Sequence, residues 1–215
     1  MRLVVMWFPS YVIELHDIHT QHTMRNIRAL LPEIRDYIDI AMTGGDDWGT
    51  QSSLIASPGT FRSVFKPFYQ ENNSLFHQIA PNVKTFIHSC GAIYPLLDDI
   101  IESGFDIINP VQWSAGSQSS RQWKDKVRRR AALWGGGIDT QHTLPLKTTS
   151  EVLDEVQQVV GYLAQDSGYI FNSIHNLLAD IEPQKIIAMY NIADLTLESD
   201  VSCSINNRRT GLSDS

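Results

Sequence analysis

Residues 85–112 read TFIHSCGAIYPLLDDIIESGFDIINPVQ, in which two short apolar runs flank a segment with helical spacing. The first run ends at His88 and Cys90, where the helical pattern begins. The middle segment, residues 93–104, predicts a helix that ends at Gly104, because glycine accepts the left-handed conformation that terminates many helices. A strand, a helix and a second strand in this order predict a parallel β-α-β unit.

The same alternation extends along most of the chain. Apolar runs predict strands near residues 39–44, 84–88, 105–109, 131–135 and 168–172. Segments with helical spacing predict helices near residues 59–79, 93–104, 121–130, 149–165 and 183–195, with Ser150 as the N-cap of the helix at 149–165. The runs are continuously apolar, which is typical of parallel strands covered on both faces. Each run ends in polar or glycine residues, which favours a (β/α)8 barrel, whose site lies at the carboxyl ends of the strands, over a doubly wound sheet.

The barrel is expected to be partial, because a complete one needs about 250 residues and only about five units are recognisable. Residues 1–36 form a weakly matched N-terminal segment that could add a strand at 2–8 and a helix at 24–37. Residues 37–198 form the barrel domain, and residues 199–215 form a polar tail expected to be disordered. We therefore expect the first units of the barrel to be missing, or to be supplied by another chain.

The composition limits the classes of function. The chain has 215 residues, 42% of them hydrophobic, and a net charge of −7, which permits a sizeable core and argues against nucleic acid as a partner. Its two cysteines do not form a disulfide framework. The apolar start lacks a signal-peptide cleavage pattern, and no apolar run reaches the length of a membrane span. The sequence therefore predicts a soluble, cytoplasmic protein.

His88 and Cys90 are candidate metal ligands. Side chains two positions apart on an extended strand point to the same side, and imidazole and thiolate are preferred ligands of zinc. A buried histidine beside a small apolar cysteine would explain the same pattern. A third ligand would favour the metal, and His175 is the predicted one, with His142 as the alternative. Both histidines lie just after predicted strands.

Asp46 and Asp47 follow the first predicted strand. Either carboxylate could act as a general acid or base, orient a ligand, or accept a hydrogen bond from a substrate. The sequence Gly-Gly-Asp-Asp is equally suited to a simple turn. The glycine-rich residues 134–139 lack the spacing of a nucleotide-binding loop, and no GxSxG nucleophile motif occurs.

Four stretches of the sequence resemble a known family when taken together. They are GGDDWGTQSSLIASPGTFRSVFKP (44–67), HSCGAIYPLLDDIIESGFDIINPVQ (88–112), LWGGGIDTQHTLP (133–145) and GYIFNSIHNLLADIEPQKIIAMYNIA (168–193). In this order they resemble the uroporphyrinogen decarboxylase superfamily, over residues 30–195. That superfamily contains the decarboxylase of haem synthesis and the methylcobamide:coenzyme M methyltransferases. The resemblance implies a (β/α)8 barrel with its site at the strand carboxyl ends.

The methyltransferase branch suggests a role for the His-x-Cys pair. There the two residues hold a zinc ion that binds a thiol, which takes a methyl group from a corrinoid carried by a partner protein. The branch's third ligand is a cysteine near the last strand, and this sequence has His175 in its place. The resemblance implies metal ligands His88, Cys90 and His175, catalytic residues Asp46, Asp47 and His175, and substrate-binding residues Gln51, Gln112, Asp139 and Gln141.

Two other functions remain open at this point. The first is cofactor-free decarboxylation of uroporphyrinogen, a tetrapyrrole, with His175 beside the substrate. The arginine-rich segment that binds substrate carboxylates in that branch is not visible in residues 1–36, which favours the methyltransferase side. The second is an inactive barrel fragment that pairs with another chain. A homodimer is a further expected assembly, and Cys203 is predicted to be dispensable.

Overall fold

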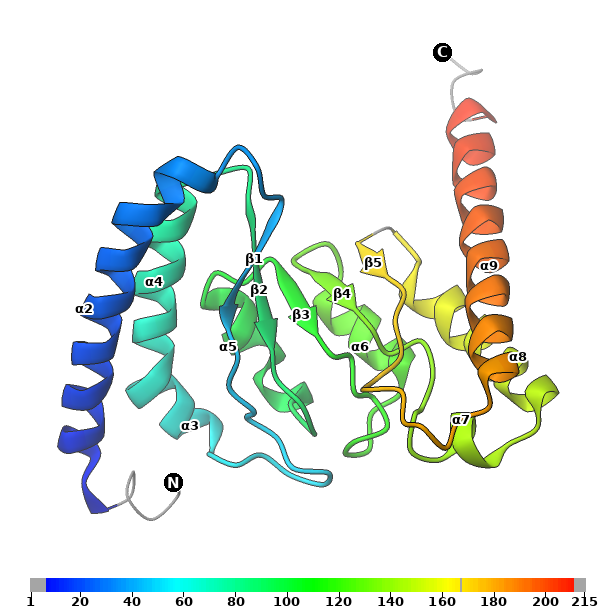
Figure 1. Ribbon diagram of the computed structural model, residues 1–215, viewed down its shortest axis with the longest axis horizontal. Coiled ribbons are helices and arrows are strands. Elements are labelled where there is room, and N and C mark those ends of the chain that lie inside the picture. The colour runs from blue at the N-terminus through cyan, green and yellow to red at the C-terminus, as the bar shows by residue number, and fades with distance from the viewer. Residues whose placement is uncertain (1–6, 167, 211–215) are drawn as a thin grey trace. The chain divides into compact units, whose positions relative to one another are not determined.

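The computed structural model describes residues 7–166 and 168–210 (Figure 1). The chain divides into two compact units. The first comprises Met1–Asn109 and Ala115–Ser117, and the second comprises Pro110–Ser114 and Gln118–Ser215. Among the described residues, no helix combines the length and the apolar character needed to cross a membrane.

Three parallel strands form the sheet of the first unit. They are β1 (Ile40–Gly44), β2 (Lys84–His88) and β3 (Ile107–Asn109), and β2 lies between the other two. The register pairs His88 with Asn109, so two polar side chains lie next to each other at the carboxyl ends of their strands. The strands lie where the apolar runs predicted them.

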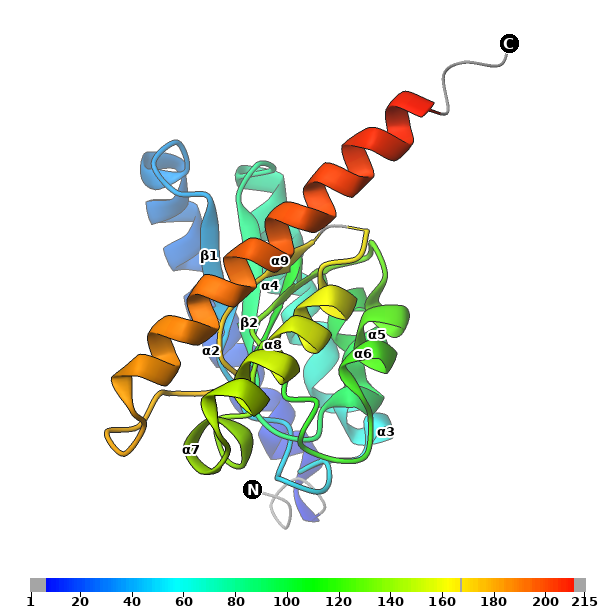
Figure 2. The same cartoon turned by 90° about the vertical axis from the view of Figure 1, so that its right-hand side faces the viewer.

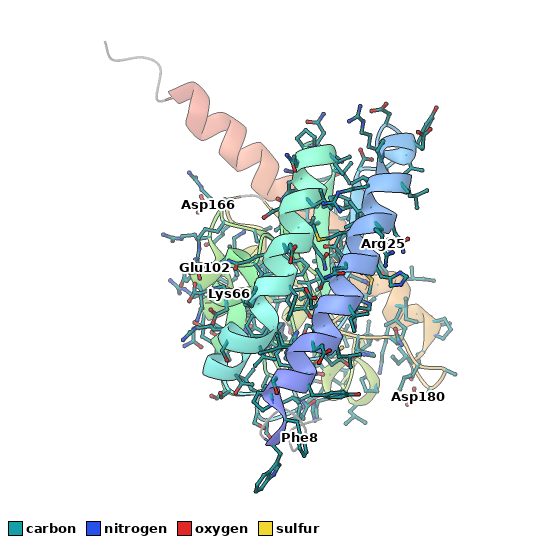
Figure 3. All side chains as sticks on the ribbon, turned by 90° about the vertical axis from the view of Figure 1, so that its left-hand side faces the viewer. Phe8, Arg25, Lys66, Glu102, Asp166 and Asp180 are labelled. Atoms are coloured by element: carbon teal, nitrogen blue, oxygen red, sulfur yellow. The ribbon has the colours of Figure 1, made fainter. Side chains whose placement is uncertain are left out.

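Two long helices cover one face of this sheet. Helix α2 (Pro9–Ile34) and helix α4 (Lys66–Ile79) run side by side (Figures 1 and 3). Buried Leu31 and Phe76 pack between them and the sheet, together with Ala41 of β1. Helix α2 is much longer than the helix expected at 24–37, and most of the strand expected at 2–8 lies outside the described residues.

The helical segment expected at 59–79 contains a change of helix type. It begins as α3 (Pro58–Thr60), continues as the π-helix η1 (Phe61–Phe65) and then becomes α4. Pro67 is the second residue of α4, directly after η1, so the change of helix type coincides with a proline that has no N–H to donate to the preceding turn.

An ion-pair network connects α4 to the helix that follows β2. That helix begins as η2 (Tyr94–Leu96) and continues as α5 (Leu97–Glu102). Burial would raise the pKa of Asp99, but hydrogen bonds from Arg62 at 2.8 Å and Lys66 at 3.0 Å hold it below its usual value. Lys66 also reaches Glu102, which lies near it in Figure 3. The chain then turns at Gly104, whose φ is +87°, as the sequence predicted.

The second unit contains the parallel pair β4 (Ala132–Trp134) and β5 (Tyr169–Ile170). Its helices are α6 (Ser120–Val127), α7 (Thr143–Leu146), α8 (Thr149–Leu163) and α9 (Pro183–Thr210). Helices α8 and α9 pack against each other around Val156, Val160 and Met189 (Figure 2). The five described strands alternate with helices, which confirms the α/β class.

Two details of the second unit differ from the sequence predictions. Thr148 caps α8 through a capping box with Glu151, whereas Ser150 was the expected cap. Thr148 is favoured because its hydroxyl and the Glu151 carboxylate each bind the other's backbone N–H. Helix α9 continues to Thr210, into the expected polar tail, and residues 211–215 of that tail lie outside the described residues.

Candidate metal centre

The carboxyl ends of β1 and β2 bring three potential metal ligands together in the first unit. Asp47, His88 and Cys90 each offer one donor atom, and these atoms all lie within 4.8 Å of one another. The Cys90 Sγ lies 3.2 Å from the His88 Nε2. His88 and Cys90 therefore share one side of the strand end, as their spacing predicted. Asp47 joins them from the neighbouring loop.

Asn109 fixes the orientation of the His88 ring. Its side-chain oxygen lies 2.6 Å from the His88 Nδ1, across the register of β2 and β3. An amide oxygen can only accept a hydrogen bond, so Nδ1 carries the ring proton. Nε2 is then left with a lone pair directed toward the Cys90 sulfur. A hydrogen-bonded distal nitrogen of this kind is usual for histidines that bind metals.

Asp47 contacts Cys90 through both the main chain and the side chain. The Asp47 Oδ1 accepts a hydrogen bond of 2.8 Å from the Cys90 backbone N–H. Burial, and secondly the negative charge of Asp47, raises the pKa of the Cys90 thiol to about 11. The Cys90 thiol therefore stays protonated at neutral pH until a bound cation balances the negative charges of the Cys90 thiolate and the Asp47 carboxylate.

The two loops that carry these residues are joined by two main-chain hydrogen bonds and one from a main-chain N–H to a serine hydroxyl. The joining hydrogen bonds are Trp48 N to Ser89 Oγ at 3.0 Å, Gly49 N to Cys90 O at 3.2 Å and Ala92 N to Thr50 O at 2.8 Å. A Cβ placed on Gly49 would lie 2.5 Å from the Ala92 nitrogen, and one on Gly91 would lie 2.4 Å from the Gly49 carbonyl carbon. The approach therefore requires glycine at both positions.

The remaining predicted residues of the first unit lie close by in sequence but have other partners. The Asp46 carboxylate accepts a hydrogen bond from the Tyr69 hydroxyl, whereas Asp47 contacts Cys90. The Gln51 carbonyl accepts a hydrogen bond of 3.0 Å from the Gly116 N–H. The structure thus gives the two consecutive aspartates different partners, a distinction that the sequence left open.

The other predicted residues belong to the second unit. They are Gln112, Asp139, Gln141, His142 and His175. Asp139 accepts hydrogen bonds from the Gln141 N–H at 2.7 Å and the His142 Nδ1 at 3.0 Å. His175 is exposed, and its carbonyl accepts a 2.7 Å hydrogen bond from the Ser173 hydroxyl. The roles assigned to His175 in metal binding and catalysis, and to Gln51, Gln112, Asp139 and Gln141 in substrate binding, stay predictions.

Sequence reasoning did not identify Asp47 as a possible ligand, nor Tyr69 as part of the site. A usable signal for Asp47 was its position after a strand adjacent to the one that carries His88. Tyr69 offered no comparable signal, because it lies 22 residues further along the chain on a helix.

Comparison with known proteins agrees with this architecture. The sequence matches the family described as Uroporphyrinogen decarboxylase (URO-D) over residues 14–195. A search of curated proteins finds no significant match. Among solved structures, a methyltransferase from Methanosarcina mazei matches with a TM-score of 0.61 and 20% sequence identity, covering 83% of this chain and 47% of that one.

The match to the solved structure concerns the fold, which is that of a partial (β/α)8 barrel of the expected kind. This chain spans about half the length of the methyltransferase that it resembles. The family match covers most of the chain, including both loops of the candidate metal centre. The protein therefore belongs to the uroporphyrinogen decarboxylase family.

Proposed function

We propose that this protein is a zinc-dependent, corrinoid-linked methyltransferase, which passes a methyl group to a thiolate held by zinc. The observation that carries the proposal is the convergence of Asp47, His88 and Cys90 at the carboxyl ends of β1 and β2. In barrels of this class the strand carboxyl ends are where catalytic residues lie. The name of the similar solved structure is in keeping with this reaction class.

The donor types fit zinc, and the donor atoms, all within 4.8 Å of one another, are close enough to converge on one ion. Nitrogen, sulfur and oxygen donors together are typical of zinc sites, with bonds of about 2.0–2.3 Å. Two donors of one tetrahedral zinc ion then lie about 3.3–3.8 Å apart. The observed Cys90 Sγ to His88 Nε2 separation of 3.2 Å needs only a small adjustment. Three protein ligands leave the fourth position for a substrate, as catalytic zinc sites require.

Each residue has a distinct part in this proposal. Asn109 accepts from the His88 Nδ1 and so fixes the ring orientation that directs Nε2 at the site. Cys90 must lose its proton on metal binding, because its thiol pKa of about 11 keeps it neutral otherwise. Asp47 balances the positive charge, and its bond to the Cys90 N–H fixes its direction. When bound, zinc would lower the pKa of a substrate thiol so that the sulfur is nucleophilic at neutral pH.

The overall reaction can be balanced with a corrinoid protein as the partner. The substrate thiol releases its proton to solvent, and its sulfur attacks the methyl group of a methyl-cobalt(III) corrinoid. A carbon–sulfur bond forms and the carbon–cobalt bond breaks. The bonding electron pair stays on the metal, which leaves cobalt(I) and a methyl thioether.

Metal analysis combined with a methyl-transfer assay tests the proposal. Wild type and Cys203→Ser should each retain about one zinc per chain after dialysis and should demethylate methylcobalamin with an alkyl thiol. Cys90→Ser should do neither, while its circular dichroism spectrum stays unchanged. The methyl-transfer proposal is wrong if wild type takes up no zinc when zinc is supplied.

Decarboxylation of uroporphyrinogen is the second candidate, and the description of the matching family favours it. This reaction needs no metal. It predicts that chelated wild type and Cys90→Ser convert uroporphyrinogen at equal rates. Zinc-loaded wild type and Cys90→Ser in the methyl-transfer assay therefore distinguish the candidates, because only the methyltransferase proposal predicts activity in the zinc-loaded wild type.

A further inference from the structure

Tyr69 holds one of the two consecutive carboxylates that follow β1. Its hydroxyl donates a hydrogen bond to Asp46, while Asp47 accepts one from the Cys90 N–H. Both aspartates lie in an exposed loop, where either side chain could turn toward the thiol. We propose that Tyr69 is a positioning residue that retains Asp46 and so leaves Asp47 as the carboxylate offered to the metal. This inference rests on the proposed function.

The Tyr69 hydroxyl has a fixed direction. The Trp48 indole Nε1 lies 3.3 Å from the Tyr69 oxygen, and an indole N–H can only donate. The Tyr69 oxygen therefore accepts a hydrogen bond from Trp48, and the Tyr69 hydroxyl donates a hydrogen bond to Asp46. Burial, followed by the charge of Asp46, raises the pKa of Tyr69 well above its usual value, so the hydroxyl remains a donor at any working pH.

An aromatic cluster keeps the Tyr69 ring in place. The ring lies 5.3 Å from that of Phe105 and 6.1 Å from that of Phe61, measured between centroids. Trp48 is 2% exposed and makes edge contacts with Phe61 at 4.9 Å and Phe65 at 4.7 Å. Phe61 and Phe65 begin and end the π-helix η1, and because side chains four residues apart share one face of a helix, both rings contact the same indole.

The three residues after Gly45 therefore have three separate partners. Asp46 binds Tyr69, Asp47 binds Cys90, and Trp48 enters the aromatic cluster. Preorganisation of this kind increases metal affinity, because the ligand loses less conformational freedom on binding. If Tyr69 loses its hydroxyl, Asp46 loses its hydrogen bond. The loop that carries Asp47 can then adopt more conformations before metal binding.

A double-mutant cycle of metal affinity tests this role. Cobalt(II) is the probe, because its bound form can be followed by absorption. Tyr69→Phe should weaken cobalt binding by about tenfold, the lower end of the range for residues that support ligands. Asp47→Ala should weaken it further, and adding Tyr69→Phe to Asp47→Ala should have no additional effect. A general loss of packing would instead lower affinity by the same factor in both backgrounds, which would overturn the proposal.

Tyr190→Phe is the matched control. It also deletes a hydroxyl with a side-chain partner, since Tyr190 lies 3.3 Å from the Asn172 Oδ1. It should leave cobalt affinity unchanged. Thermal unfolding of all variants establishes that each protein is folded before its affinity is compared.

Amide hydrogen exchange separates this inference from the proposed function. In the metal-free protein, Tyr69→Phe should speed exchange of the Cys90 amide, whose acceptor is Asp47, and leave the amide of Ile87 in β2 unaffected. Absence of metal binding in wild type together with faster Cys90 exchange would contradict the methyltransferase but retain the positioning role. Unchanged Cys90 exchange in Tyr69→Phe would contradict the positioning role whatever the metal result.

Discussion

Each unit of the molecule has an acid and a histidine after its strands, but the two pairs are arranged differently. In the first unit, Asp47 and His88 converge on the Cys90 thiol. In the second unit, Asp139 and His142 follow β4 and lie 3.0 Å apart through the Asp139 Oδ2 and the His142 Nδ1. By residue type alone, both pairs could bind a metal.

The second pair uses its hydrogen-bonding capacity to build a turn. The Asp139 carboxylate also accepts from the backbone N–H groups of Gln141 and His142, at 2.7 and 3.3 Å. Glu155 accepts in turn from the Asp139 N–H at 2.9 Å and the Thr143 hydroxyl at 2.6 Å. The comparison teaches that an acid and a histidine at strand ends do not define a site. The His142 Nε2 has a lone pair just as the His88 Nε2 does, and what separates the first pair is the soft donor beside it, the Cys90 sulfur at 3.2 Å.

Removal of a first-unit ligand should have the largest effect. His88→Ala should weaken zinc binding by more than about 100-fold, which exceeds the usual effect of supporting residues. His142→Ala should leave zinc affinity within about twofold if the second pair only shapes a turn. Competition with a chromogenic chelator measures both. Equal losses in the two variants would break the distinction between the two pairs.

Removal of the residue that orients His88 should have the next largest effect. Asn109→Ala should weaken zinc binding by about 10–100-fold, because the His88 ring loses the hydrogen bond that fixes its tautomer. Asn109→Asp keeps an acceptor and should retain most of the affinity. If Asn109→Asp and Asn109→Ala bind zinc equally weakly, Asn109 acts through packing and not through its oxygen.

Two glycine substitutions should change stability in opposite directions. Gly49→Ala forces a Cβ to 2.5 Å from the Ala92 nitrogen, and we expect a loss of about 1–3 kcal/mol in the free energy of unfolding. Gly161→Ala, in helix α8, meets nothing within 4 Å and should stabilise the protein by about 0.5–1 kcal/mol. Urea denaturation followed by circular dichroism gives both values. Stabilisation by Gly49→Ala would contradict the close approach of the two loops.

The smallest expected effect concerns the reactivity of Cys90. Only the thiolate reacts with iodoacetamide, so a thiol pKa of about 11 means that alkylation of the metal-free protein increases as pH rises toward that value. Asp47→Asn removes a negative charge, which should lower the pKa and speed alkylation near pH 8 by no more than about tenfold. Both the wild-type site and Asp47→Asn are measured in chains that also carry Cys203→Ser, so that Cys90 is the cysteine that is alkylated. Slower alkylation of Asp47→Asn would mean that Asp47 does not disfavour the thiolate.

The sequence predicted the strands because a continuous apolar run is a local property, although Ile40 and Met42 of β1 are exposed and not covered as the run indicated. It also predicted that His88 and Cys90 share a side, since the spacing of two residues decides this on an extended chain. The full length of α2 was missed, because the apolar residues at its start, among them exposed Tyr11, Ile13 and Leu15, do not follow one amphipathic face. The N-cap of α8 was placed at Ser150, two residues after Thr148, which forms a capping box with Glu151.

The choice between Asp46 and Asp47 could not be made from the sequence. Two neighbouring aspartates in a turn have the same local chemistry, and what separates them is tertiary. Tyr69 reaches one of them from a helix, and the backbone contact at Gly49 and Gly91 brings the other to Cys90. Contacts of this kind depend on the packing of distant segments, which periodicity and spacing do not encode.

X-ray absorption at the zinc edge tests the central claim most directly. Zinc-loaded wild type should show one sulfur neighbour at about 2.3 Å and nitrogen or oxygen neighbours at about 2.0–2.2 Å. In Cys90→Ser, any remaining zinc should lack the sulfur neighbour. A wild-type spectrum with nitrogen and oxygen neighbours alone would contradict the assignment of Cys90, and with it the metal centre formed by Asp47, His88 and Cys90.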